Sequence, residues 1–190
     1  MKRIPGRIRI LTSKEENALV NCFIKLGYPD FGDLVQILID TGMREGNAIR
    51  LQWRDVDFIT GLISIWENKA EKPYSIPMTT RVQSILKKRF ESGLKKPFPI
   101  GQSTFQHVFT RVRVKLGITD PQFVAHALRH TACTRLIAVG MPLKKVKEFM
   151  GHKLIETTER YIHLNPEDLR DLAVTLEKFG TTFGTTLSQK

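Results

Sequence analysis

The chain has 190 residues, of which 41% are hydrophobic and 26% charged, a composition typical of a globular protein with one sizeable core. Its 30 Lys and Arg residues outnumber its 19 Asp and Glu residues, and the net charge of +11 indicates a polyanionic partner, most often a nucleic acid. No apolar run approaches the roughly 18 residues of a membrane span, and the cysteines, Cys22 and Cys133, lie in apolar helical patterns that fit a reducing cytosol rather than a disulfide framework.

Helices are predicted in the N-terminal part of the chain. Residues 1–11 form a basic linker or arm that lacks the apolar stretch of a signal peptide. A helix begins near Ser13, because Ser13 and Glu16 have the spacing of a capping box, and it ends at Gly27. Two further helices, separated by a break at Gly42, are expected over residues 30–41 and 44–51.

The next segment has the composition of β-strands. Residues 53–58 and 62–66 are rich in β-branched and aromatic side chains, and the Thr-Gly pair at 60–61 between them is typical of a hairpin turn. A third strand is predicted over residues 74–77, joined to the second by a polar turn over residues 68–72. The sheet is therefore expected to have three strands and to be small and antiparallel.

Helical patterns return after the sheet. Thr80 and Ser103 are each followed three residues later by a glutamine, which predicts two helix starts, and Val82, Leu86 and Phe90 form the inner face of the first helix. The remaining predicted helices cover residues 125–139, residues 142–150, a segment that contains Tyr161, and residues 167–178. The chain is therefore assigned to the α+β class, mainly α-helical with a small three-stranded antiparallel sheet.

His126 and Arg129 are the first candidate site residues. They lie three residues apart, on a helix face separate from the buried stripe. An imidazole beside a guanidinium makes a phosphate clamp, because arginine donates two parallel hydrogen bonds and keeps its charge. A solvated helix face is the ordinary alternative. A metal site formed by His126 and His130 lacks the acidic residue of a zinc-protease helix and a nearby cysteine pair.

His152 and Tyr161 form the second candidate pair, nine residues apart. Gly151 ends a helix, which leaves the His152 ring on a turn where it can face a cleft, and Tyr161 lies on the following helix. The ordinary alternative is a tyrosine without a catalytic role, buried in the core or lying on the surface. A phenol, with a pKa of about 10, becomes a useful nucleophile where cationic groups stabilise the developing charge.

Arg44 and Lys69 are weaker candidates by themselves. Arg44 follows the helix break at Gly42, which either aims its side chain into a cleft or leaves it exposed. Lys69 lies in the polar turn between the second and third strands. Turn lysines are normally solvated, although a lysine there can reach into a groove and donate a proton.

The order of these segments resembles the tyrosine recombinase (phage integrase) family, over roughly residues 12–165. TGMRxxxxIRLQWRDVD is similar to the segment with the family's first catalytic arginine, NKAEKPYSIPM to the segment with its lysine, HALRHTACTRL to its His-x-x-Arg signature, and MGHKLIETTERYIHL to its closing segment with the nucleophile. The resemblance implies the family's catalytic-domain fold and a catalytic set of Arg44, Lys69, His126, Arg129, His152 and Tyr161. Asn47 stands where the family usually has Glu or Asp, which puts the fine positioning of Arg44 in question.

The mechanism implied by this resemblance is DNA strand cleavage and rejoining. Tyr161 attacks a phosphodiester and becomes linked to the 3′-phosphate, while a 5′-hydroxyl leaves. The set of Arg44, Arg129 and His152 holds the non-bridging oxygens, Lys69 protonates the leaving oxygen, and His126 acts as base or phosphate donor. The sequence has no acidic cluster for two magnesium ions and no P-loop, so no metal, ATP or other cofactor is expected.

The resemblance also implies a domain organisation and partners. Residues 12–179 correspond to the catalytic domain, residues 180–190 to a flexible tail, and the family's N-terminal core-binding domain is not seen before the first helix. The expected partner is double-stranded DNA at attachment sites, bound by a tetramer that exchanges C-terminal tails, with accessory DNA-bending proteins and no membrane, in the bacterial cytosol or nucleoid. Basic clusters at residues 87–89, 111–115 and 144–147 are candidates to follow the DNA backbone.

Three other functions remain open from the sequence. A non-catalytic DNA-binding module would keep the fold, but the intact set of six candidate residues argues against it. A type IB topoisomerase-like relaxase would use the same chemistry without exchanging strands. A structural or protein-only interaction module fits the basic charge least well.

Overall fold

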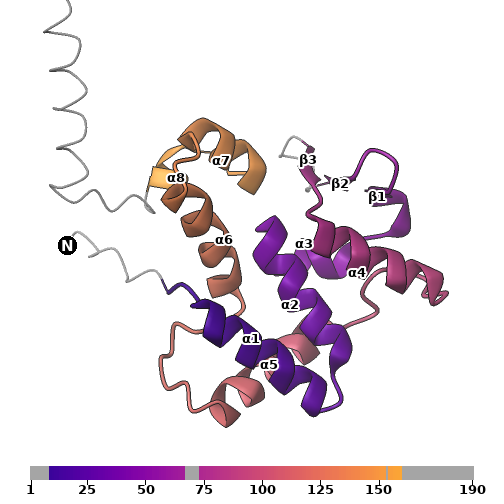
Figure 1. Cartoon of the computed structure of the whole chain (residues 1–190), viewed down its shortest axis with the longest axis vertical. Coiled ribbons are helices and arrows are strands. Elements are labelled where there is room, and N and C mark those ends of the chain that lie inside the picture. The colour runs from indigo at the N-terminus through magenta and orange to yellow at the C-terminus, as the bar shows by residue number, and fades with distance from the viewer. Residues whose placement is uncertain (1–8, 67–72, 153, 160–190) are drawn as a thin grey trace, which may run out of the picture.

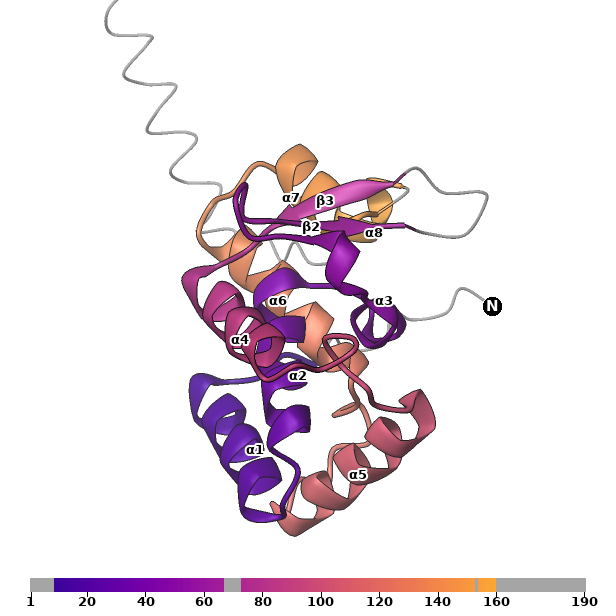
Figure 2. The same ribbon diagram turned by 90° about the vertical axis from the view of Figure 1, so that its right-hand side faces the viewer.

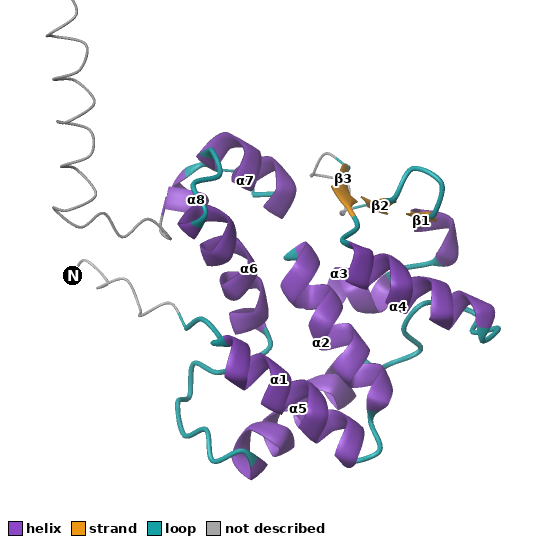
Figure 3. Cartoon of the chain, viewed as in Figure 1, coloured by secondary structure: helices purple, strands orange, loops and turns teal. Residues whose placement is uncertain are grey.

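Helices form most of the molecule, and a small sheet lies at one end beside the last helices (Figures 1 and 3). The computed structural model describes residues 9–66, 73–152 and 154–159. In chain order the described elements are α1 (Ser13–Lys25), α2 (Pro29–Thr41), α3 (Glu45–Arg50), the 3₁₀ turn η1 (Trp53–Asp55), β1 (Val56–Asp57), β2 (Leu62–Ile65), β3 (Tyr74–Pro77), α4 (Thr80–Glu91), α5 (Gln102–Lys115), α6 (His126–Ala138), α7 (Leu143–Met150) and α8 (Glu156–Glu159). The α+β class predicted from the sequence is confirmed.

Helix α2 is the centre of the core. It contacts α1, α3, α4 and α6, and Leu34, Ile37 and Leu38 on it are almost completely buried. On the side of α1 and α5, five phenylalanine rings form a cluster with centroid separations of 5.6–6.4 Å: Phe23, Phe31, Phe105, Phe109 and Phe123. Each such side chain contributes roughly 1.5–3 kcal/mol by its burial, so this core holds α2 rigidly in place.

The sheet is a meander of three antiparallel strands in the order β1-β2-β3. Ile63 pairs with Val56 on one side and with Ile76 on the other, and these side chains alternate with more exposed ones. The first strand is shorter than the predicted range 53–58. Residues 53–55 form the 3₁₀ turn instead, because Asp55 accepts a hydrogen bond from the Gln52 backbone at 2.9 Å and closes a capping box.

Helix caps lie one residue before the predicted positions in α1 and α4. Thr12, not Ser13, caps α1 and forms the capping box with Glu15. Glu16 is buried and forms an ion pair with Arg81 at 2.9 Å, so it is not available for capping. The Thr79 hydroxyl caps α4 by accepting a hydrogen bond from the Val82 N–H, while the cap of α5 is Gly101, with no side-chain hydrogen bond.

Arg89 corrects two predictions for α4. Phe90, expected on the inner face, is 52% exposed, whereas Arg89 is 5% exposed. The Arg89 guanidinium bonds Asp30 at 2.7 Å and Asp33 at 2.9 Å, and it lies 4.6 Å from the Phe98 ring centroid. Arg89 therefore links α4 to α2 inside the protein. The prediction that it belongs to a cluster that follows the DNA backbone is wrong.

Several predicted features fall outside the described residues: residues 1–8 of the arm predicted over residues 1–11, Lys69, Tyr161, the helix at residues 167–178 and the tail at residues 180–190. Leu11, within the predicted arm, is buried in the core. Cys22 and Cys133 are buried and free, as predicted. Among the helices of the described ranges, none has the length and apolar character to cross a membrane.

Candidate active site

Arg129 ties together the two turns that carry other candidate residues. Its side chain is 4% exposed, and its guanidinium donates hydrogen bonds to the carbonyl oxygens of Gly42 and, at 2.6 Å, Met150. These carbonyls lie at the C-terminal ends of α2 and α7, where the partial negative charge of a helix favours a cation. The sequence prediction that Arg129 lies on a face away from the buried stripe is wrong, because the side chain points into the protein.

Two glycines allow these turns to come close. Gly42 and Gly151 end α2 and α7 in the left-handed conformation, with φ of 62° and 61°. A Cβ on Gly42 would lie 2.5 Å from the Met150 sulfur, and a Cβ on Gly151 would lie 2.4 Å from the ring of Tyr74. The first residue of β3 therefore packs directly on the turn that precedes His152, and Figure 2 shows β3 beside α7.

His152 is held at both its backbone and its ring. Its N–H donates to the Lys147 carbonyl at 3.0 Å, which fixes the turn after α7. A hydrogen bond of 2.9 Å joins its Nδ1 to the hydroxyl of Thr158 in α8, and both side chains are buried. This bond ties α8 to the turn after α7.

Burial of His152 and the charge around it lower the pKa of its imidazole to about 4. Burial is the largest cause, and the positive charges of Arg129 and Arg44 and the imidazoles of His126 and His130 add to it. The imidazole is therefore neutral at pH 7. Its turn is joined by Arg129 to the turn that precedes Arg44.

This lowered pKa predicts a loss of stability in acid. The imidazole has a pKa of about 6.5 in the unfolded chain, so the unfolded state binds more protons than the native state between that pH and about pH 4. The free energy of unfolding should therefore fall by about 3 kcal/mol as the pH drops through this window. Urea unfolding between pH 7 and pH 4 should show a flatter pH dependence in His152→Gln.

His107 supplies the control for this measurement, because it is exposed on α5. The variant His107→Gln should keep the wild-type slope of stability against pH. An unchanged slope in His152→Gln would show that other groups cause the acid sensitivity.

Arg44 and His126 line one open cavity of about 680 Å³, together with residues of α3 and α5. Arg44 is half-buried at the N-cap of α3, and His126 is the exposed first residue of α6. The His126 and His130 rings lie edge to face, 4.5 Å apart. Among the described residues, no group of three or more His, Cys, Asp or Glu side chains has the arrangement of a metal site.

Asn47, at the position where the sequence departs from the family pattern, also lines this cavity. Its amide oxygen accepts a hydrogen bond of 2.9 Å from Arg50, one turn later in α3. The chain thus pairs this position with a second arginine.

Lys69 and Tyr161 themselves lie outside the described residues. The strand positions nearest to Lys69 that are described, Ile65 and Tyr74, are paired in the sheet. Tyr74 packs against Gly151. Tyr74, where the described chain resumes as β3 after Lys69, therefore lies against the turn that precedes His152.

Comparison with known proteins agrees with this geometry. The model of the phage integrase family matches residues 9–168. The chain belongs to the phage integrase family. It is 28% identical over 161 residues to the tyrosine recombinase XerD of Staphylococcus saprophyticus. This match covers 77% of the chain and 54% of that protein. A tyrosine recombinase of Thermosipho africanus is 27% identical over 180 residues, 90% of the chain and 61% of that protein.

Solved structures of integrases share the fold. The catalytic domain of bacteriophage HP1 integrase has a TM-score of 0.71 and 24% identity, covering 88% of the chain and 94% of that domain. A Tn1549 transposon integrase, solved in complex with a circular intermediate DNA, has a TM-score of 0.78 and 22% identity, covering 92% of the chain and 68% of that protein. The chain spans about half the length of the curated relatives that it matches.

Two residues of the candidate site were not found from the sequence. Thr158 holds the His152 ring, and Tyr74 docks the sheet on Gly151. Thr158 lies in a Thr-Thr pair and Tyr74 in a strand pattern, and neither pattern shows which distant side chain the residue contacts. A spacing of six residues from His152, across a turn, gives no helical or strand periodicity that would connect Thr158 to the ring.

Proposed function

We propose that the chain is the catalytic part of a tyrosine-type site-specific DNA recombinase. It cleaves and rejoins DNA strands through a covalent 3′-phosphotyrosine intermediate, for the integration or excision of mobile DNA. The observation that carries this proposal is that the buried Arg129 joins the turn before Arg44 to the turn before His152, while Arg44 and His126 line one cavity of about 680 Å³. Cations and donors gathered at one point suit a phosphodiester whose negative charge grows in the transition state.

The cleavage step assigns a role to each candidate. The phenol oxygen of Tyr161 bonds to phosphorus, the bond from phosphorus to the 5′-oxygen breaks, and Lys69 gives that oxygen its proton. His126 accepts the phenol proton. In the second step the 5′-hydroxyl of the partner strand attacks the phosphotyrosine, and the phenol is released with its proton restored.

The remaining residues stabilise charge and orientation. Arg44, which lines the cavity, binds non-bridging oxygens of the phosphate, and the buried Arg129 adds its positive charge while fixing the two turns. With the Thr158 hydroxyl as donor to Nδ1, the neutral His152 carries its proton on Nε2 and donates it to a phosphate oxygen. A neutral imidazole donates a hydrogen bond to the phosphate and adds no positive charge that would repel the arginines.

The proposed partner is duplex DNA at attachment sites. The net charge of +11 supports it, as does the DNA in the complex of the structurally similar Tn1549 integrase. Tetramer formation by exchange of the tail at residues 180–190, accessory DNA-bending proteins and a place in the bacterial cytosol or nucleoid belong to the same proposal. So does the division into an arm at residues 1–11 and a catalytic domain at residues 12–179.

A nicked duplex made from the DNA that flanks the gene tests the cleavage chemistry. A nick close to the scissile phosphate releases the leaving fragment, so a covalent protein–DNA adduct should accumulate on a denaturing gel. Mass spectrometry should place the nucleotide on Tyr161. Tyr161→Phe should give no adduct, because the attacking oxygen is removed.

The chain contains three tyrosines, so Tyr28→Phe is a matched control that should keep the adduct. An adduct that persists in Tyr161→Phe, or DNA binding with no adduct in the wild type, would contradict the proposal, and the second result would favour a non-catalytic binding module. Relaxation of supercoiled DNA without joined products from two sites would favour a relaxase.

A further inference from the structure

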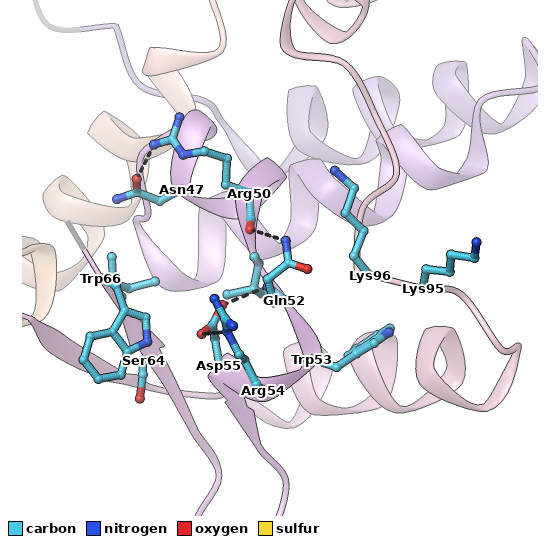
Figure 4. Close-up of a pocket in the computed structure, with 12 residues that line it drawn as sticks. Asn47, Arg50, Gln52, Trp53, Arg54, Asp55, Ser64, Trp66, Lys95 and Lys96 are labelled. Atoms are coloured by element: carbon cyan, nitrogen blue, oxygen red, sulfur yellow. Dashed lines mark hydrogen bonds and ion pairs between the residues drawn. The ribbon is translucent and has the colours of Figure 1, made fainter. Parts of the chain in front are cut away.

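A second, strongly basic groove lies next to the candidate active site (Figure 4). Its volume is about 950 Å³, and it is bordered by α3, η1, β2 and the segment between α4 and α5. Its charged lining consists of Arg50, Arg54, Lys95, Lys96 and Asp55, so among the described lining residues four cations face one carboxylate. None of these four cations belongs to the basic clusters predicted from the sequence.

Hydrogen bonds inside the protein shape this groove. The Trp53 indole N–H donates to the Leu94 carbonyl at 2.6 Å and thereby fixes the segment that presents Lys95 and Lys96. The Gln52 amide donates to the Arg50 carbonyl at 2.9 Å. The groove is therefore a formed surface, in which the positions of the backbone segments that carry the cations are set by the fold.

Trp66 gives this basic surface an aromatic platform. It follows β2 directly, lines the groove and is 70% exposed. The indole therefore offers an open apolar face at the edge of a basic surface. Exposed aromatic rings within a basic groove are the combination that binds single-stranded nucleic acid, because unpaired bases stack on the ring while cations follow the phosphates.

The groove continues into the candidate site. Asn47 and Arg50 line both the groove and the cavity that contains Arg44 and His126. A strand that leaves the neighbourhood of Arg44 can therefore pass along α3 into the groove. This path matters for strand exchange, since the end with the free 5′-hydroxyl must leave its own duplex before it attacks elsewhere.

We propose that this groove binds an unpaired DNA strand beside the cleaved phosphate, with one base stacked on Trp66 and the backbone along Arg54, Lys95 and Lys96. This inference rests on the proposed function, because the strand it holds is the product of the cleavage step. An unpaired strand is favoured over a duplex because bases inside a duplex are already stacked on each other and offer no open face to an indole.

Tryptophan fluorescence tests the inference without any cleavage step. The chain has two tryptophans, Trp53 and Trp66, and the measurement is made in a Tyr161→Phe background so that no covalent product forms. The probe is a single-stranded oligothymidine of roughly 12 nucleotides. Stacking should quench Trp66 in the parent protein, and the anisotropy of a fluorophore on the oligothymidine gives the affinity of every variant. Trp66→Ala should weaken binding about fivefold to a hundredfold, whereas Trp66→Phe should restore most of the affinity.

The charged side of the groove has its own readout. Lys95→Gln and Lys96→Gln should each lower the slope of log affinity against log salt by about 0.7, the value for one phosphate contact on a single strand. Lys25→Gln is the matched control, since Lys25 is exposed in the last turn of α1 and does not line the groove. It should leave this slope unchanged.

Two outcomes would overturn the inference: equal affinity of Trp66→Ala and its parent for the oligothymidine, or a loss in Trp66→Ala that is as large for an oligo(dT)·oligo(dA) duplex as for the single strand. Both leave the proposed function intact, since adduct formation is measured separately on the nicked duplex. Conversely, Trp66-dependent binding together with a failure to form the Tyr161 adduct would confirm a strand-binding groove and contradict the cleavage proposal.

Discussion

Replacement of Arg129 by lysine should lower the rate of DNA cleavage by roughly two to three orders of magnitude and should also destabilise the fold. The guanidinium donates to the carbonyls of Gly42 and Met150 at the same time. A lysine ammonium is a compact point charge without this fork, so it cannot span both carbonyls. One buried carbonyl left without its partner costs about 1–3 kcal/mol, and the turns before Arg44 and His152 would separate.

Both parts of this expectation can be measured on one protein preparation. Single-turnover cleavage of the nicked duplex gives the rate, and urea unfolding gives the free energy of unfolding. The two effects have the same origin, because the bonds that stabilise the fold also hold Arg44 and His152 around the phosphate. A rate loss without any change in stability would mean that Arg129 acts on the phosphate alone.

Arg135→Lys is the matched control, on the same helix and with the same chemical change. Arg135 forms an ion pair with Glu16 at 2.8 Å, and its side chain is 42% exposed. An ammonium can keep this single contact to the buried Glu16 carboxylate, which also keeps its ion pair with Arg81. Cleavage should stay at the wild-type rate in this variant. Wild-type stability and cleavage in Arg129→Lys would contradict the positioning role.

The fold was predictable where the apolar periodicity of a helix ends at the same place as a glycine or proline in the sequence. The predicted ranges for α2, α6 and α7 are within two residues of the observed bounds, since an apolar stripe with a glycine or proline at its edge leaves few alternatives. The caps were less predictable. Thr12 and Ser13 are equally good capping residues, and the choice depends on Glu16, which is drawn into the core by Arg81.

Arg89 and Phe90 show the limit of reading a helix face. Apolar spacing favours Phe90 as the inward residue of α4. The sequence does not reveal that two carboxylates on α2, those of Asp30 and Asp33, lie where they can bind Arg89. A buried arginine is stable only because these distant partners exist. The same reason explains Arg129, whose two carbonyl partners belong to segments 87 and 21 residues away.

For the candidate site, the sequence identified residues by family resemblance, and the structure adds how they are held. Arg44, His126, Arg129 and His152 were singled out from motifs; in the structure Arg129 joins the turns before Arg44 and His152, and Arg44 and His126 line one cavity. Trp66 and Lys95 were not singled out, because the groove that they line joins segments from three parts of the chain. Such a surface exists only after folding.

Gly151→Ala should cost about 2–4 kcal/mol of stability and lower cleavage roughly a hundredfold. Part of the stability cost is the left-handed backbone, with φ of 61°, which disfavours a Cβ by about 1–2 kcal/mol. The rest arises because the new methyl group would lie 2.4–2.8 Å from three atoms of the Tyr74 side chain. Tyr74 must move, and the His152 turn and the end of the sheet move apart with it.

Gly27→Ala separates these two contributions. Gly27 has φ of 81°, also left-handed, but a Cβ there would meet no atom within 4 Å. It should therefore show only the backbone cost of about 1–2 kcal/mol and leave cleavage unchanged. The double variant Gly151→Ala/Tyr74→Ala completes the test. Because the shortened side chain makes room for the methyl group, the two substitutions should cost less together than the sum of their separate effects. Equal losses in Gly151→Ala and Gly27→Ala, with additive effects in the double variant, would mean that the contact between Tyr74 and Gly151 does not hold the sheet against the His152 turn.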